Sequence, residues 1–309
     1  MELNESINKK TRNVYHSQHR RILNDEICYN RLRYMNSEEF FDLGEGYFKD
    51  KVCLDAGCGN TIMLSQQFHT FGAKKVYAFD LGEDWIPDAE AELEKFGVPS
   101  GAIELSSGNV KNIHFPDGMF DIVACNGVLT HLEDKNAVSQ SFAELSRVNR
   151  GWGGMLYVSL GVGKNSGLFE GAIFPALREY YASNSAFKDL IDNIKPQDFA
   201  EIYGKIAGLM LSHTGETAPI FPAELFDEDW CVFIQNTIQV PTRLNILYSQ
   251  QDMEDLFIQN GYKNVKRLNR YVKRKNIRKF LSPLHYDKTS EISQLLFGEG
   301  YLEFIAEKI

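Results

Sequence analysis

The sequence has few cysteines and no long apolar run, and both absences exclude classes of protein. Its five cysteines among 309 residues are an odd, scattered set, so a disulfide framework is not expected. No run approaches the roughly 18 to 20 apolar residues of a membrane span, and the first ten residues contain no apolar segment typical of a secretory signal. No Cys-x-x-Cys or His-x-x-x-His pair suggests a metal site. We therefore expect a soluble, cytoplasmic protein without a membrane partner or a bound metal.

The charged residues are unevenly distributed. Thirty-three Lys and Arg against 42 Asp and Glu give a net charge of −9, which provides no overall field for attracting nucleic acid. Between residues 263 and 279, however, nine residues are basic and none is acidic. Such a run is usually a solvated face, and the alternative is a patch for a phosphate-bearing or polyanionic substrate. The other proportions, 43% hydrophobic and 24% charged, are typical of one large or two ordinary globular domains.

Residues 52–61 (VCLDAGCGNT) place a short apolar run before two glycines spaced by one residue. This pattern predicts a strand, a tight turn that cradles a ligand and the start of a helix, because glycine allows positive φ and helix N-termini present unpaired N–H groups. A dinucleotide fingerprint needs a third glycine where this chain has Ile62. Asp55 is also unfavourable beside a pyrophosphate, because like charges repel, and suits a ligand with a cationic amino group.

The motif Leu-Asp-Ala-Gly-Cys-Gly at 54–59 resembles the first motif of the class I S-adenosylmethionine-dependent methyltransferases. Further landmarks of this family follow in order: an apolar strand ending in Asp80, 21 residues after Gly59, and a turn at 115–121 that leads into another strand. One departure is Thr61, where the family often has a further glycine. The resemblance covers roughly residues 47–160 and 245–309.

The resemblance implies an α/β fold: a doubly wound, Rossmann-like, mostly parallel seven-stranded sheet with an antiparallel last strand and a largely helical inserted cap. The alternation of five strands with helices points to the same parallel sheet. We predict an N-terminal helical lid at 1–46, an S-adenosylmethionine-binding methyltransferase domain at 47–160 and 244–309, and a substrate cap rich in aromatic residues at 161–243.

The resemblance also implies which residues contact S-adenosylmethionine. The two glycines of the turn would lie against its methionine part, Asp55 near its amino group, and Asp80 on both ribose hydroxyls. Asn109 stands where the family commonly has an Asp facing the adenine amine, and its amide oxygen can accept the same hydrogen bond. Asn126, at the end of the fourth strand, would lie near the sulfonium. The predicted cofactor-binding residues are Asp55, Gly57, Cys58, Gly59, Asp80, Leu81, Asn109, Val110 and Asn126.

Methyl transfer is an in-line displacement, so an enzyme contributes mainly by holding the reacting atoms collinear and by excluding water. Where the acceptor needs a general base, His131 in the loop after the fourth strand is our first candidate, and packing is its alternative role. Further candidates are His213, Tyr180 and Tyr181 in the cap.

The N-terminal region offers candidates for the lid, namely Tyr15, His16 and His19, although an ordinary surface position is the expectation for each histidine. Asp84 is predicted to cap the helix that follows it, which leaves Asp80 available for the ligand.

We therefore expect methyl transfer to a small-molecule acceptor, at oxygen more than at nitrogen, and a negatively charged acceptor would be attracted to the 263–279 stretch. Two alternatives stay open: an RNA or tRNA methyltransferase that uses this stretch, and a protein that binds S-adenosylmethionine without catalysis. The fourth strand is followed by Asn-Gly-Val-Leu at 126–129 instead of an Asn-Pro-Pro-Tyr-like motif, which argues against the nucleic-acid base methylation that uses that motif.

Overall fold

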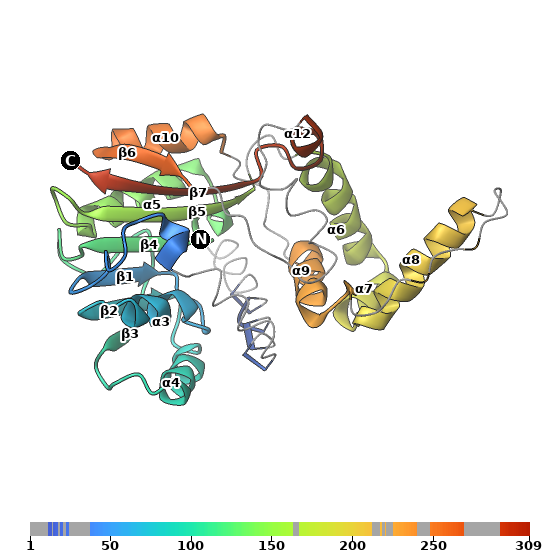
Figure 1. Ribbon diagram of the computed structural model, residues 1–309, viewed down its shortest axis with the longest axis horizontal. Coiled ribbons are helices and arrows are strands. Elements are labelled where there is room, and N and C mark those ends of the chain that lie inside the picture. Colours follow the sequence, from blue (N-terminus) through green and yellow to red (C-terminus); the bar gives the residue numbers. More distant parts are fainter. Residues whose placement is uncertain are drawn as a thin grey trace. The chain divides into compact units, whose positions relative to one another are not determined.

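A computed structural model describes residues 12–13, 15–17, 19–20, 23–24, 38–162, 167–211, 217, 220, 225–239, 248–268 and 291–309. The chain divides into two compact units, whose strands and α-helices are labelled in Figure 1. The first comprises Met1–Ser166, Thr242–Arg270 and Gly298–Ile309. The second comprises Gly167–Pro241 and Tyr271–Phe297.

The first unit is built on one seven-stranded sheet (Figure 1). Its strands are β1 (Val52–Ala56), β2 (Lys75–Asp80), β3 (Ile103–Ser107), β4 (Ile122–Asn126), β5 (Met155–Val162), β6 (Tyr262–Arg267) and β7 (Tyr301–Lys308). They lie in the order β3-β2-β1-β4-β5-β7-β6, and β7 runs in the opposite direction to the other six, pairing antiparallel with β5 and β6. The predicted mostly parallel sheet with an antiparallel last strand is confirmed. Strand order reverses between β1 and β4, and ligands of such sheets bind outside the carboxyl ends of the strands at this point.

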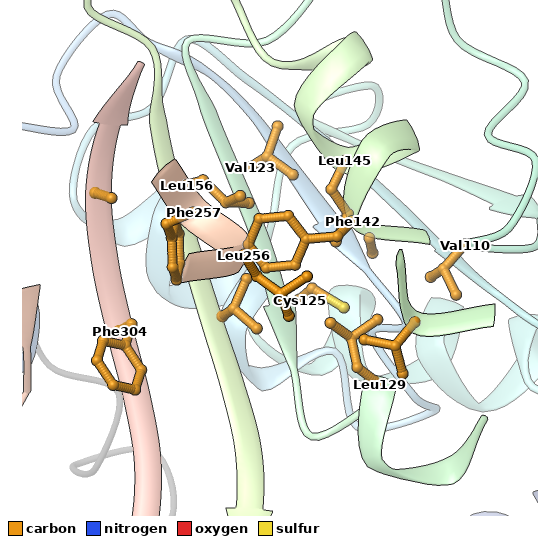
Figure 2. Packing of buried hydrophobic residues seen from close by; sticks show 14 of the residues in the cluster. Val110, Val123, Cys125, Leu129, Phe142, Leu145, Leu156, Leu256, Phe257 and Phe304 are labelled. Carbon is orange, nitrogen blue, oxygen red and sulfur yellow. The ribbon is translucent and has the colours of Figure 1, made fainter. Parts of the chain in front are cut away.

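Helices cover both faces of the sheet, as a parallel sheet requires. They are η1 (Glu38–Phe41), α3 (Met63–Thr70), α4 (Ile86–Lys95), η2 (Leu129–His131), α5 (Lys135–Val148) and α10 (Gln250–Gln259). On one face, Phe142 of α5 and Phe257 of α10 meet edge to face with ring centroids 4.9 Å apart (Figure 2). On the other face lies Phe68 of α3. Neighbouring β1 residues alternate between the faces, Leu54 toward the first and Cys53 toward the second. Each such large apolar side chain contributes about 1.5 to 3 kcal/mol through burial.

The helix ends show which local signals the fold uses. Asp134 caps α5 by accepting a 2.8 Å hydrogen bond from the N–H of Ala137, and Ser249 caps α10 in a reciprocal capping box. The prediction that Asp84 caps α4 is wrong. The cap residue is Trp85, which makes no side-chain capping bond, and Asp84 instead lies 3.6 Å from the Arg12 guanidinium.

The described part of the second unit is helical. Its elements are η3 (Phe169–Ile173), α6 (Phe174–Ser183), α7 (Ser185–Asp192), α8 (Pro196–Leu211), α9 (Glu228–Gln239) and α12 (Glu291–Phe297). Phe199, Phe226 and Trp230 pack together in its own buried cluster. A substrate-cap role for residues 161–243 stays a prediction. In the described parts of both units, none of the helices combines the length and apolar character needed to cross a membrane.

Candidate active site

The turn after β1 has a backbone that only glycine adopts easily. Gly57 and Gly59 have φ angles of +85° and +61°, in the left-handed region. The N–H of Gly57 donates a 2.8 Å hydrogen bond to the carbonyl of Phe79 on β2. A Cβ at Gly57 would lie only 2.2 Å from Cγ2 of Val128, in the loop that follows β4. The turn therefore packs directly against the loop across the point where strand order reverses.

Asp80, the last residue of β2, is fixed beside this turn. Its Oδ2 accepts a 2.8 Å hydrogen bond from the N–H of Gly59, and its Oδ1 accepts a 2.6 Å bond from the N–H of Leu81. Burial raises the pKa of Asp80, and the two backbone N–H groups oppose that rise. Each carboxylate oxygen retains capacity for a second donor, so the group can also accept hydrogen bonds from ligand hydroxyls.

Asp55 points into the protein, where its side chain joins β1 to α3. It is buried, and its Oδ2 accepts a 2.7 Å hydrogen bond from the hydroxyl of Ser65. Burial raises the pKa of Asp55 to about 7, and the negative charge of Asp80 acts in the same direction. The side chain thus supports the turn from within the fold, and a direct contact with a ligand amino group stays a prediction.

We expect Asp55 to make the ligand-free protein less stable as pH rises from about 4 to about 7. The folded state holds this proton up to a pKa of about 7, whereas the unfolded chain releases it near 3.8, so the folded state binds more protons in this window. Relative to that of the Asp55→Asn variant, the free energy of unfolding of the wild-type protein should fall by up to about 1.4 kcal/mol for each pH unit in this window. Chemical denaturation at pH 5, 6, 7 and 8 measures this difference, and parallel profiles for the two proteins would contradict it.

Two of the predicted asparagines lie at or just beyond the carboxyl ends of β3 and β4, which β2 and β1 separate in the sheet. Asn109, after β3, uses its Oδ1 to accept a 2.9 Å hydrogen bond from the N–H of Lys111, while the adjacent Val110 side chain is part of the core (Figure 2). Asn126, the last residue of β4, is exposed, and Tyr157 donates to its Oδ1 at 3.4 Å. Asn126 therefore offers its amide group at the carboxyl edge of the sheet.

Part of the chain before the sheet lies against the glycine turn. We call the described residues between 12 and 24 the N-terminal segment; most of them are helical. The ring of His19 lies 2.8 Å from where a Cβ on Gly59 would stand, and its Nδ1 is 3.0 Å from Oδ1 of Asn60. His16 is buried and His19 is half-buried, and removal from water lowers the pKa of both, that of His19 to about 4. The expectation of a surface position is wrong for His16, and His19 is packed between the turn and Asn60 with part of its surface exposed.

Comparison with known proteins identifies the domain that carries this site. Residues 54–158 match the family described as a methyltransferase domain. A ubiquinone biosynthesis O-methyltransferase of Pseudoalteromonas translucida is 33% identical over 98 residues, which are 32% of this chain and 40% of the relative. Protein arginine N-methyltransferase 2 of Dictyostelium discoideum is 33% identical over 111 residues, 36% of this chain and 21% of the relative. The chain thus spans less than half the length of either curated relative.

Among solved structures, the magnesium protoporphyrin IX methyltransferase of Synechocystis with bound SAH has a similar fold. It aligns over 98% of this chain and 100% of its own with a TM-score of 0.51 and 13% identity. The family match and the strand order agree. This chain carries a class I S-adenosylmethionine-dependent methyltransferase domain. The cofactor is S-adenosylmethionine.

In this methyltransferase domain, the predicted cofactor residues gather at the carboxyl ends of β1, β2 and β4 and in the loop after β3. The cofactor-binding role of each stays a prediction. The sequence did not predict the neighbouring residues that hold this edge of the sheet together. They are Asn60, Ser65 and Val128 of the methyltransferase domain and Arg12 and Arg20 of the N-terminal segment. One signal was available, because positions 12, 16, 19 and 20 follow the spacing of a single helical face.

His131, the predicted general base, ends η2 directly after the loop that contacts the turn. Leu129 anchors this short helix in the core (Figure 2), while His131 is half-buried. The ring of Tyr15, from the N-terminal segment, packs against the His131 ring with centroids 4.7 Å apart. The imidazole is therefore held by packing at the carboxyl edge of the sheet.

The other predicted bases have different surroundings. The hydroxyl of Tyr181 donates to Oδ1 of Asp192 at 2.5 Å, and burial raises the pKa of Tyr181. Tyr180 is exposed and accepts a 3.0 Å hydrogen bond from Asn184. Both tyrosines lie in the second unit, and His213 lies outside the described residues.

The described members of the basic stretch have partners. Lys263 lies 3.4 Å from Glu307, and Lys266 pairs with Asp42. Arg267 donates to Oε1 of Gln250 at 2.8 Å. These cations are engaged within the first unit, and the basic residues from 270 to 279 lie outside the described residues.

Proposed function

We propose that the protein transfers the methyl group of S-adenosylmethionine to an oxygen atom of a small-molecule acceptor. The observation that carries this proposal is the cradle at the β1/β4 switch point, where the left-handed Gly57 and Gly59 turn lies beside the fixed Asp80 carboxylate. The relative from Pseudoalteromonas, named as an O-methyltransferase of ubiquinone biosynthesis, supports oxygen as the accepting atom. The arginine methyltransferase relative makes a protein nitrogen the principal alternative.

The residues of the cradle fit this cofactor. Because Gly57 and Gly59 carry no Cβ, the turn can follow its left-handed path between Val128 and His19, and its backbone would lie against the methionine part. Asp80 offers charged acceptors for two ribose hydroxyls, and Asn126 offers a polar group at the end of β4. S-adenosylmethionine supplies an activated methyl group on a sulfonium. The protein's part is to orient the acceptor and exclude water, and His131 would take up the proton that the acceptor hydroxyl loses.

A screen of acceptors tests the proposal. The purified protein is incubated with S-adenosylmethionine and one of four acceptor sets: small hydroxyl or phenol compounds with and without negative charge, carboxylic acids, arginine-containing peptides, and tRNA. Formation of S-adenosylhomocysteine is measured, and the methylated product is identified by mass spectrometry. We expect turnover with one of the hydroxyl compounds. Methylation of arginine peptides alone or of tRNA alone would contradict the proposal. Binding of the cofactor without turnover of any acceptor set would favour a non-catalytic role.

His131→Ala should leave S-adenosylhomocysteine affinity within about twofold of wild type and lower kcat by about 10² to 10⁴, the usual contribution of a general base. His69→Ala, at the end of α3, is the matched control because His69 is also half-buried but lies outside the predicted site. Binding is measured by calorimetry and kcat with the acceptor found in the screen. An unchanged kcat would show that His131 only packs the loop against Tyr15.

A further inference from the structure

Asn60, directly after the glycine turn, joins three parts of the fold through one side chain. It is fully buried. Its Nδ2 donates to the carbonyl of His16 at 3.2 Å and to Oδ2 of Asp88, on α4, at 3.0 Å. Because both partners are acceptors, the amide has one orientation, and its Oδ1 must accept from Nδ1–H of His19 at 3.0 Å. One amide therefore connects the turn, α4 and the N-terminal segment, and its two donor hydrogens are both used.

Ion pairs flank this buried amide on either side. Arg20 donates from Nε to the same Oδ2 of Asp88 at 2.7 Å, and Arg12 lies 3.6 Å from Asp84. Arg20 is 54% and Asp84 51% exposed, so water screens both pairs and each holds the segment only weakly. The hydrogen bonds of Asn60 are shielded from water, and a buried polar group that loses its partners is costly. Among the polar contacts of the segment, those of Asn60 are therefore the strongest, and they add to the packing of Tyr15 on His131.

The segment held in this way closes one side of the cradle. The two nearest atoms of the His19 ring lie 2.8 and 2.9 Å from the Cβ position of Gly59, so the imidazole packs directly on the turn, beside the place that the proposed site gives to the methionine part. Asp84 and Asp88 stand on the domain side, and the segment brings the guanidinium groups of Arg12 and Arg20 to meet them. Charge on the two sides is complementary, which favours the closed arrangement.

We propose that Asn60 is a positioning residue that holds the N-terminal segment across the glycine turn, with His19 as the wall over the amino-acid end of the bound cofactor. The proposal rests on the proposed cofactor site at the turn and is independent of the acceptor. Closure through Asn60 slows release of the amino-acid end of the ligand. The adenosine end, which Asp80 and the loop after β3 would hold, does not depend on it.

Asn60→Asp tests this role with little change in shape. The new carboxylate oxygen faces the carbonyl of His16 and the carboxylate of Asp88, so two attractive contacts become repulsive. We expect S-adenosylhomocysteine to bind about tenfold more weakly and to dissociate correspondingly faster, the scale of one lost buried hydrogen bond. Methylthioadenosine, which lacks the amino-acid part, should bind within about twofold of wild type. His19→Ala, which removes the wall and its hydrogen bond to Oδ1 of Asn60, should reproduce the same selective loss.

Asn149→Asp is the matched control. Asn149 is also buried; it donates to the carbonyls of Phe120 and Met155 at 3.2 Å each and accepts from the hydroxyl of Tyr262 at 3.0 Å. These partners lie at the amino ends of β4 and β5, at the opposite edge of the sheet from the turn. Asn149→Asp should lower the melting temperature while both ligand affinities stay at wild-type values.

Hydrogen exchange of peptides spanning residues 12–24 reports the segment directly. S-adenosylhomocysteine should slow exchange in wild type and in Asn149→Asp and leave it unchanged in Asn60→Asp. The positioning role alone would be overturned by either of two results. One is that S-adenosylhomocysteine protects the segment from exchange equally in Asn60→Asp and in wild type. The other is that the ratio of the affinities for S-adenosylhomocysteine and methylthioadenosine is the same in both proteins. Failure of the wild-type protein to bind either ligand would overturn the cofactor site as well.

Discussion

Gly57→Ala is expected to weaken S-adenosylhomocysteine binding by at least about 100-fold. At φ +85° an alanine carries about 1 to 2 kcal/mol of backbone strain, and its Cβ would stand 2.2 Å from Cγ2 of Val128. Either the turn or the loop after β4 must then move, and both line the proposed site. Calorimetric titration measures the affinity, and the melting temperature shows how much of the change is loss of stability.

Gly101→Ala separates the clash from the strain. Gly101 has a nearly equal φ of +80°, but no described atom lies within 4 Å of its Cβ position. This variant should lose stability by the strain alone and bind the ligand as wild type does. Val128→Ala added to Gly57→Ala removes the clashing methyl groups and should restore part of the affinity. If Gly57→Ala bound as tightly as Gly101→Ala, the turn would not be the cofactor cradle.

Asp80→Ala is expected to weaken S-adenosylhomocysteine binding by a similar factor. The proposed two hydrogen bonds from ribose hydroxyls to a carboxylate are each worth about 1.5 to 3 kcal/mol, which together amounts to at least about 100-fold in affinity. The substitution also removes the acceptor for the N–H groups of Gly59 and Leu81, so the turn loses a support. Calorimetry with S-adenosylhomocysteine, and with adenosine alone, measures the loss. Both ligands should be affected because both carry the ribose.

Asp121→Asn is the control for this carboxylate. Asp121 also accepts from a backbone N–H, that of Val52 at 2.9 Å, and from Arg150 at 2.7 Å, but it lies at the amino end of the sheet. The Asp121→Asn substitution should lower the stability of the protein and leave its affinity for S-adenosylhomocysteine unchanged. Asp80→Asn should be intermediate, since its NH₂ group would face one of the two backbone N–H donors. Wild-type affinity in both Asp80 variants would remove the ribose assignment.

The sequence was most informative where a local pattern determines the structure. The apolar run ending in Asp80 predicted a strand whose last residue lies at the ligand edge, and the structure has it there. The direction of the Asp55 side chain could not be read in the same way. β1 is buried on both faces, so its sequence lacks the polar alternation that tells one face of a strand from the other.

Long-range contacts account for the other predictions that were wrong. Asp84 has the local sequence of a helix cap, but the Arg12 guanidinium, 72 positions earlier in the chain, lies beside it. His16 and His19 have ordinary surface neighbours in sequence, but His16 is buried and His19 is half-buried because the N-terminal segment lies against Asn60 and Gly59. Neither contact follows from the residues within one helical turn.

The position of β7 has a consequence for the order in which the protein is assembled. β7 is synthesised after β6 yet lies between β5 and β6, so β6 has no place in the sheet until the ribosome has made residues 301–308. The strands that form the cradle, β1, β2 and β4, all lie within residues 52–126 and pair with one another without it. We expect the cofactor-binding half of the sheet to form first during translation, with the β6 edge added only after β7 has emerged.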